Sequence, residues 1–390
     1  MFKKYLVILI SIIILFSVFS KPAFAIQDPL AVPNNKIGIH ILTESELEKA
    51  AKLVNTNNGD WGYVTMPIQA GDKNIEKWQK FMDDCKRLRI IPILRLATEG
   101  DYFNTAVWRK PLPSDLVDFA NFLESLDWPT ENRYVIIFNE VNRGDEWGGA
   151  ADPAEYAELL SFAVTVFKSK SPNFFIISAG LDNAAPSQGT KYMNQYAYMR
   201  AMNAAVPGIY NQVDGLSSHS YPNPGFSQPP NTTSMMGTGS FIHERALAQN
   251  LSGKKLPVFI TETGWAADVV SDDARYSYYQ HALANVWNDS SIVAITPFLL
   301  EAGAGPFEKF SFTSPNGELT KQYQLIRDLP KVRGAPVQSV RVLSARAEKT
   351  TQDNYLPVKD FSHRTKEPPK PFTVSEIAQT GFEWLMGLDR

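Results

Sequence analysis

Two glutamates in this chain stand where apolar runs give way to polar residues. The run Tyr134–Phe138 is followed by Asn139 and Glu140, and the run Leu256–Ile260 is followed at the second position by Glu262. Moving a carboxylate from water to the end of a buried strand costs free energy, so a purely structural strand would more often end in a small neutral residue. Two such carboxylates brought face to face have the chemistry that cleavage of a glycosidic bond requires.

The separation of the two carboxyl groups decides the course of that reaction. Roughly 5–5.5 Å lets one attack as a nucleophile while the other acts as acid and base, with retention of configuration, whereas ~6.5–9.5 Å admits a water and gives inversion. The nucleophile must stay ionised and the acid must hold a proton, so their surroundings must differ. The elements that carry Glu140 and Glu262 therefore decide the outcome.

Between Lys36 and about Asp328 the chain alternates short apolar, β-branched runs with amphipathic stretches. Because the runs are almost continuously apolar, they are typical of parallel strands covered on both faces. The eight predicted strands are Ile37–Leu42, Gly62–Met66, Ile90–Leu96, Tyr134–Phe138, Phe174–Ala179, Val213–Ser217, Pro257–Ile260 and Ile292–Leu299. Apolar residues at helical spacing predict helices between them, in stretches such as Glu44–Val54, Ser114–Leu126, Pro153–Lys168 and Asp273–Trp287.

Eight strand–helix units in roughly 290 residues favour an α/β fold of the (β/α)8 TIM-barrel type, which takes about 250 residues plus insertions. A doubly wound open sheet is the alternative, but it predicts a glycine-rich phosphate loop after the first strand, and Ile37–Leu42 offers none. Barrel enzymes assemble their sites at the C-terminal ends of the strands. Glu140 on the fourth strand and Glu262 on the seventh would therefore converge across the mouth of the barrel.

Short motifs around these glutamates resemble the cellulase-like superfamily of retaining barrel glycosidases, often called clan A. The motifs are Asn139-Glu140, the lone Glu262, and His219-Ser220-Tyr221 at the sixth strand. The resemblance implies that Glu140 is the general acid/base and Glu262 the nucleophile. It further implies that Asn139 binds the sugar 2-hydroxyl, that Tyr221 donates to Glu262, and that His219 contacts sugar or nucleophile.

The chain departs from the pattern of that superfamily at two places. Many members have proline after the Asn–Glu pair, where this chain has Val141, and many have tryptophan at the end of the eighth strand, where this chain has the segment Pro297–Gly303. The first change alters a loop. The second removes a usual platform for the sugar at the cleavage point, which leaves the substrate open.

Further residues are candidates for contacts with a substrate. Arg95 is a cation within the third strand and His40 ends the first; either could face the mouth, and a structural ion pair or a core histidine is an equally good interpretation. Trp147, Trp265 and Phe307 follow the fourth, seventh and eighth strands, where aromatic faces could stack on sugars. Trp265 is the strongest candidate of the three.

Other residue types set limits on the chemistry. The single cysteine, Cys85, excludes an internal disulfide, and we interpret it, like Trp78 and Trp287, as helix packing. The five histidines are scattered without ligand spacing, so we predict no metal and no cofactor. No Gly-x-Ser-x-Gly motif supports a serine hydrolase. A net charge of −3 argues against a nucleic-acid partner, so we expect a carbohydrate substrate and a monomer.

The two ends of the chain differ in composition from the barrel segment. Lysines at positions 3 and 4, an apolar run and Ala23-Phe24-Ala25 predict a signal peptide over residues 1–25, with cleavage after Ala25. An uncleaved anchor is the alternative, but the run is shorter than the ~20 residues that span a bilayer. We expect a secreted or cell-envelope protein with no membrane insertion after cleavage. Residues 26–335 would form the barrel and 336–390 a linker or tail, with a short helix near Phe372–Leu388.

The sequence thus predicts an exported retaining glycoside hydrolase that acts on a β-linked poly- or oligosaccharide. Two alternatives use the same residues. The first is a non-catalytic carbohydrate-binding barrel, although a binder would not need both Glu140 and Glu262. The second is a transglycosylase that remodels the cell envelope and excludes water from its site.

Overall fold

A computed structural model describes residues 26–98, 105–231, 234–303 and 305–339. The predicted signal peptide, the tail beyond Ser339 and the predicted terminal helix lie outside these residues. Among the helices of the described residues, none combines the length and the apolar character that crossing a bilayer would require.

Eight parallel strands form one sheet in the order of the chain. They are β1 Gly38–His40, β2 Gly62–Gln69, β3 Ile90–Ala97, β4 Arg133–Ile136, β5 Phe174–Ser178, β6 Gly215–His219, β7 Val258–Glu262 and β8 Ile292–Ile295. The sheet closes on itself because Ile37 bridges Ile295 in parallel and the His40 N–H donates to the Pro297 carbonyl at 3.0 Å. The predicted TIM barrel is confirmed.

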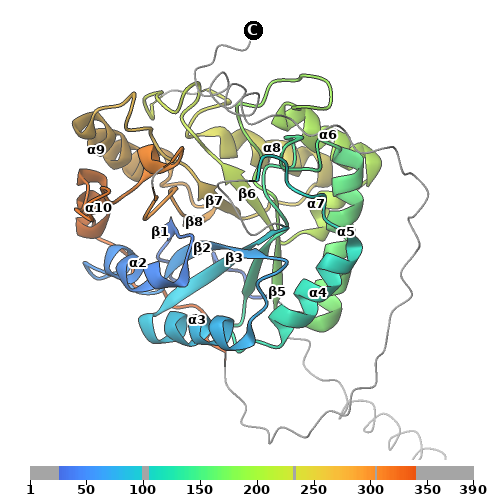
Figure 1. Ribbon diagram of the computed structural model, residues 1–390, viewed down its shortest axis with the longest axis horizontal. Coiled ribbons are helices and arrows are strands. Elements are labelled where there is room, and N and C mark those ends of the chain that lie inside the picture. Colours follow the sequence, from blue (N-terminus) through green and yellow to red (C-terminus); the bar gives the residue numbers. More distant parts are fainter. Residues whose placement is uncertain (1–25, 99–104, 232–233, 304, 340–390) are drawn as a thin grey trace, which may run out of the picture. The chain divides into compact units, whose positions relative to one another are not determined.

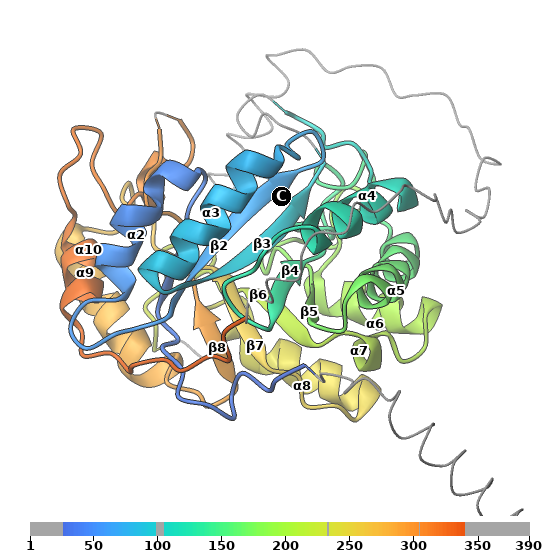
Figure 2. The same cartoon turned by 90° about the horizontal axis from the view of Figure 1, so that it is seen from below.

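Helices follow the strands and surround the barrel (Figure 1). They are α2 Leu47–Val54, α3 Ile75–Leu88, α4 Pro113–Glu124, α5 Pro153–Lys170, α6 Gln195–Ala205, α7 Ile209–Gln212, α8 Ser240–Ser252, α9 Asp272–His281 and α10 Lys321–Asp328. Figure 2 shows α3 beside β2 and β3. Local sequence sets the helix ends. In α5, for example, Asp152 accepts hydrogen bonds from the N–H groups of Ala154 and Glu155, and Pro153 occupies the first turn.

Aromatic side chains fill the inside of the barrel. The Tyr134 ring lies 5.0 Å from Phe175 and 5.4 Å from Phe259, measured between ring centroids. The outward side chains of the strands pack against the helices in a second, larger core. Trp78, Cys85 and Trp287 are buried in that outer core, as predicted. The side chains of the strands therefore support the barrel on both faces, as a doubly covered parallel sheet requires.

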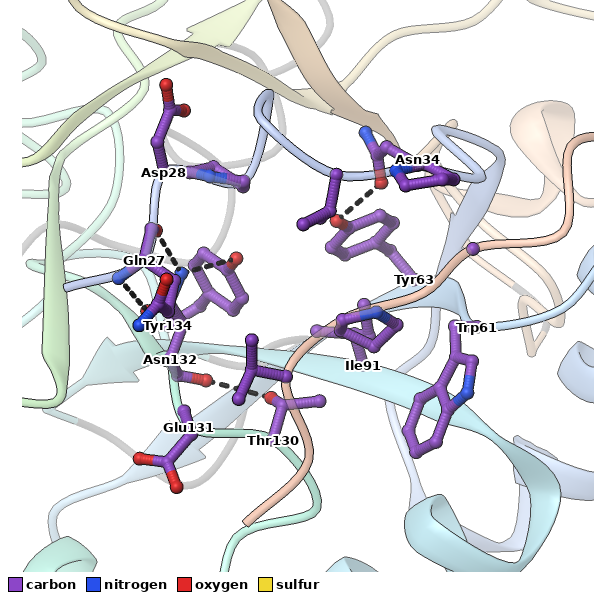
Figure 3. A pocket seen from close by; sticks show the side chains of 16 residues that line it. Gln27, Asp28, Asn34, Trp61, Tyr63, Ile91, Thr130, Glu131, Asn132 and Tyr134 are labelled. Carbon is purple, nitrogen blue, oxygen red and sulfur yellow. Dashed lines mark hydrogen bonds between the residues drawn. The ribbon is translucent and has the colours of Figure 1, made fainter.

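Segments from both ends of the barrel region cross its floor, at the N-terminal ends of the strands. The Asn132 side chain accepts from the Gln27 N–H at 3.1 Å and donates to the Gln27 carbonyl at 2.8 Å, while the Glu131 N–H donates to the Val337 carbonyl at 2.8 Å. Gln27, Asn132 and Glu131 line a pocket there, shown in Figure 3. Residues 336–339, which we assigned to the tail, also lie on the floor, where the Ser339 N–H donates to the Pro129 carbonyl at 3.3 Å.

Candidate active site

The mouth of the barrel brings Glu140 and Glu262 together. Glu262 is the last residue of β7, and Glu140 lies in the loop that follows β4. One carboxylate oxygen of each and one ring nitrogen of His219, from the end of β6, all lie within 4.8 Å of one another. This limit on the oxygen–oxygen distance is close to the roughly 5–5.5 Å of a retaining pair and well below the ~6.5–9.5 Å of an inverting pair.

An unusual backbone places Glu140. Both Phe138 and Glu140 have positive φ, at 66° and 33°, a conformation that non-glycine residues adopt rarely and chiefly where surrounding contacts enforce it. The Glu140 N–H donates to the Gly180 carbonyl at 2.9 Å. A Cβ on Gly180 would lie 2.2 Å from the His219 ring. Glycine at this position thus lets the β5 loop support Glu140 and still leave room for the imidazole.

The surroundings of Glu262 keep it ionised. Arg95 on β3 donates to Oε1, Tyr221 donates to Oε2 at 3.0 Å, and Nδ1 of His219 lies 3.8 Å from Oε2. Burial by itself would raise the pKa of Glu262, which is only 7% exposed, but His219 and Arg95 outweigh burial and lower it. Glu262 therefore has the ionisation state that a nucleophile needs.

Arg95 also binds Asn139, the residue that precedes Glu140. Its Nη1 donates to Oδ1 of Asn139 at 2.8 Å as well as to Glu262. Of the two interpretations left open for Arg95, the structure combines both, because the guanidinium makes an ion pair inside the barrel and that ion pair belongs to the site.

His219 lies between the two glutamates. Its Nδ1 is 2.9 Å from Oε1 of Glu140 and 3.8 Å from Oε2 of Glu262. Burial lowers the pKa of His219, but Glu262 and Glu140 more than compensate and raise it above its usual value. The two carboxylates therefore favour the protonated form of the imidazole, in which Nδ1 donates to Glu140.

His40, at the end of β1, approaches Oε1 of Glu262, whereas His219 approaches Oε2. Its ring is fully buried, its Nε2 is 3.9 Å from Oε1 of Glu262, and it meets the Phe298 ring edge-on at 5.1 Å. Burial, helped by Arg95, lowers the pKa of His40 to about 3. Within the described residues neither ring nitrogen has a hydrogen-bond partner. His40 is thus a neutral imidazole beside Glu262.

Arg143, which was not predicted from the sequence, lies within ion-pair distance of Glu140. Its guanidinium lies 3.8 Å from Oε2 of Glu140, 2.6 Å from Asp145 and 3.3 Å from Asp182 on the β5 loop. Burial and Glu140 raise the pKa of Asp182 to about 6, although Arg143 opposes them. The spacing of Glu140 and Arg143, three residues apart, was visible in the sequence, but polar residues in loops are too common to single it out.

The prediction that Trp265 stacks on a sugar is wrong. Its side chain is 1% exposed, its Nε1 donates to the Gln228 carbonyl at 2.8 Å, and its ring packs 4.8 Å from Tyr279 of α9. Trp147 is also fully buried, with its ring 5.5 Å from Tyr156 of α5. Both indole rings pack against helices and are buried, so neither has an exposed face on which a ligand could stack.

Five other aromatic rings form a cluster that includes Tyr221, the donor to Glu262. We call them the aromatic wall, and they are Tyr221, Phe226, Phe298, Phe307 and Phe310. Phe298, which stands near the end of β8, meets Phe307 edge-on at 5.2 Å. Phe226 and Phe307 are partly exposed. Of the three aromatic candidates named from the sequence, only Phe307 therefore presents a surface that a ligand could reach.

Metal binding suits these residues poorly, although two carboxylates and an imidazole are close enough for it. Glu262 is already paired with Arg95, and His219 carries a proton where a metal would need a lone pair. A divalent cation would have to displace both positive charges. The arrangement favours proton transfer and nucleophilic attack.

No protein-family model matches the chain, and no curated protein matches its sequence. Solved structures do resemble it. A family 39 glycoside hydrolase from Bacteroides cellulosilyticus WH2 has a TM-score of 0.53 at 16% identity, over 77% of this chain and 64% of that one. A GH39 β-xylosidase from Caulobacter crescentus has a TM-score of 0.52 at 14% identity, over 76% and 71% of the two chains. A GH5_18 protein from Bifidobacterium longum subsp. infantis has a TM-score of 0.55 at 11% identity, over 77% and 80%. At these identities the likeness is one of fold.

Proposed function

We propose that this chain is a retaining glycoside hydrolase that acts on a β-linked poly- or oligosaccharide. The observation that carries the proposal is the approach of Glu140 and Glu262 to within 4.8 Å at the mouth of a closed barrel. The structural neighbours are named as glycoside hydrolases, which supports the same class. We also propose that the protein is exported, on the strength of the leader-like residues 1–25.

In the first step Glu262 attacks the anomeric carbon while the glycosidic oxygen takes a proton. The carboxylate of Glu262 is oriented by Arg95 and Tyr221, one on each oxygen. Glu140 and His219 are joined by a 2.9 Å hydrogen bond and hold one proton between them. We assign delivery of that proton to Glu140, whose carboxyl group is partly exposed at the mouth.

In the second step Glu140 acts as a base and takes a proton from water, which attacks the glycosyl–Glu262 ester and releases the sugar with its configuration retained. Esterification removes the negative charge of Glu262, which is one of the two charges that raise the pKa of His219. The proton that Glu140 and His219 shared has passed to the leaving group, so the imidazole is now neutral and Glu140 is ionised, which is the state required of a base. The proton that Glu140 takes from water restores the shared one.

Residues around the pair would bind the sugar at the cleavage point. Because the oxygen of Asn139 accepts from Arg95, its NH2 group is the end that can donate to a hydroxyl. In the aromatic wall, the partly exposed Phe226 and Phe307 offer apolar surface on which a sugar could pack. These contacts are compatible with several β-linked sugars, so the identity of the glycan is a matter for direct assay.

The test is reducing-end release from β-glucans, mannans, xylans and galactans by the full chain, beside Glu262→Gln and the control Glu158→Gln. Glu158 is an exposed residue of α5. We expect one glycan to be cut by wild type and control and not by Glu262→Gln, with the β-anomer as the first product by NMR. Equal binding of a glycan by all three proteins without cleavage would indicate a binding barrel. Longer products instead of new reducing ends would indicate a transglycosylase.

A further inference from the structure

A buried carboxyl group lies behind β6, on the side away from the mouth. Glu244 of α8 is only 3% exposed and accepts a hydrogen bond from Ser218 at 3.0 Å. Ser218 is 2.9 Å from the hydroxyl of Ser220, which is 3.2 Å from the hydroxyl of Ser240 at the start of α8. All three hydroxyl groups are buried. A continuous chain of hydrogen bonds thus joins α8 to β6.

Ser218, in β6, and Ser220, just after it, alternate with the residues of the site. Ser218 and Ser220 lie against Glu244 and Ser240 of α8, while His219 and Tyr221 contact Glu140 and Glu262 at the mouth. Thr263, after β7, donates to the Ser220 carbonyl at 2.7 Å and ties the same segment to the strand of the nucleophile. The network that ends at Glu244 therefore holds the backbone from which His219 and Tyr221 project.

Glu244 also lines a cavity between the barrel wall and helices α5 to α8, together with Ser178 and Tyr156. The Ser178 hydroxyl has no hydrogen-bond partner within the described residues. Most of the other side chains that line this cavity are apolar, so the carboxyl group of Glu244 lies in surroundings that disfavour its charged form.

The titratable groups that interact electrostatically with Glu244 come from three elements: His219 of β6, on the other face of the strand, Tyr196 of α6 and Tyr210 of α7. Among the described residues no lysine or arginine is paired with it. Burial raises the pKa of Glu244 to about 7, although Ser240, Ser218 and His219 oppose the rise. Both phenols have raised pKa values and stay neutral. Of these three groups only His219 can carry a charge near neutral pH, and it directly follows Ser218, the residue that donates to Glu244.

We propose that Glu244 is a positioning residue for His219 and Tyr221, and that the loss of its proton strengthens the hold of His219 on the catalytic proton. The inference rests on the proposed function, since it concerns the proton that Glu140 delivers. A negative Glu244 stabilises the imidazolium across the strand, so His219 and Glu140 keep their shared proton to higher pH. A neutral Glu244 still accepts the hydrogen bond from Ser218, but the imidazolium is then stabilised only by Glu140 and Glu262.

The direct test is an NMR titration of the His219 ring nitrogens in the full chain, which does not depend on any substrate. Glu244→Gln imitates the neutral acid at every pH. We expect the wild-type ring signals to show an inflection near pH 7 that is missing from Glu244→Gln, and we expect His219 to lose its proton at lower pH in the variant. Identical titrations of the two proteins would overturn the proposal. If Glu244→Gln does not fold, Ser218→Ala takes its place, because it removes a donor that favours the ionised form.

Activity provides a second readout once a substrate is known. We expect kcat/KM of Glu244→Gln to match the wild type within about twofold at pH 5.5, where both side chains are neutral. The alkaline limb should move down by up to about one pH unit, which is up to about a tenfold loss on that limb. Glu158→Gln should leave the profile unchanged. A uniform loss at all pH values would mean that Glu244 is merely structural and would contradict the proposal.

Discussion

His219 places a single ring nitrogen 2.9 Å from Glu140 and 3.8 Å from Glu262. The two carboxylates are therefore coupled through one imidazolium, and a change of charge on either glutamate is felt by the other. Glu262 has, in addition, Arg95 and Tyr221 on its oxygens, whereas Glu140 is approached more distantly by Arg143. This asymmetry separates the two roles, because the additional donors keep Glu262 ionised, as a nucleophile must be.

Replacing Glu140 should reveal which role each of the two glutamates plays. We expect Glu140→Gln to lower kcat/KM by about 10²–10⁴-fold on a natural glycan, which needs a protonated leaving group. Aryl glycosides with acidic leaving groups should lose less. Azide, a nucleophile that needs no base, should restore turnover of Glu140→Gln and yield the β-glycosyl azide, as judged by NMR. An α-glycosyl azide from this variant would mean that the roles of Glu140 and Glu262 are exchanged.

Tyr221→Phe should weaken the nucleophile without removing it. The variant loses a donor that lies 3.0 Å from Oε2 of Glu262. A hydrogen bond to a charged group contributes about 1.5–3 kcal/mol, so we expect kcat/KM to fall about 10- to 100-fold. The pKa of Glu262 should rise with the loss of the donor, so the acid limb of kcat/KM against pH should move to higher pH.

A suitable control is Tyr198→Phe, which removes a buried phenol that donates to the carbonyl of Asp152, the residue before α5. It should leave the acid limb in place. An acid limb that also stays in place in Tyr221→Phe would show that the phenol does not hold the charge of Glu262.

The sequence was informative where position along a strand determines direction. Glu140, Glu262, His219 and Tyr221 each follow a run of buried strand residues, and in a closed barrel the ends of such runs meet at one face. Arg95 was recognisable because a cation within an apolar strand needs a partner. These inferences rest on where the apolar runs end and on closure of the sheet, both of which the order of strand-like and helix-like segments in the sequence predicts.

The remaining features depend on the paths of loops and on helix faces. Trp265 follows its strand as closely as a binding residue would, but the loop turns outward and the indole packs on α9. Arg143 and Glu244 find their partners on other βα units, at Asp182 and Ser218. A contact between distant segments that involves common polar residues leaves no periodic signal in a single sequence.

The buried imidazole of His40 should make the fold sensitive to acid. Its pKa is about 3 in the folded protein and about 6.5 in the unfolded chain. Between these values the unfolded chain binds more protons, so the free energy of unfolding falls as the pH is lowered from 6.5 toward 3, by up to roughly 1.4 kcal/mol per pH unit. His219, whose pKa is raised, acts oppositely and stabilises the fold below pH 6.5.

Urea denaturation of wild type and His40→Phe from pH 7 to pH 4 measures this contribution. We expect the difference in stability between the two proteins to shift in favour of the variant as the pH falls. His281→Phe, at the exposed end of α9, controls for the loss of a histidine from the chain. A difference that is independent of pH would show that His40 takes up its proton in the folded state.

Arg143 should be needed for stability as well as for the site. It is largely buried among Glu140, Asp145 and Asp182, so Arg143→Met leaves carboxylates without their shared cation. Breaking a buried pair in this way costs about 3–5 kcal/mol. The pKa of Asp182, already about 6, should rise further, so the loss of stability in Arg143→Met should be smaller at pH 5 than at pH 7.5. Adding Asp182→Asn removes one of the carboxylates left without a cation and should recover part of the loss at pH 7.5.

Denaturant unfolding of the wild type, the two single variants and the double variant measures the coupling between Arg143 and Asp182. Additive effects would place the cost in packing around Arg143, and the ion pair with the β5 loop would then not be what holds the Glu140 loop in position.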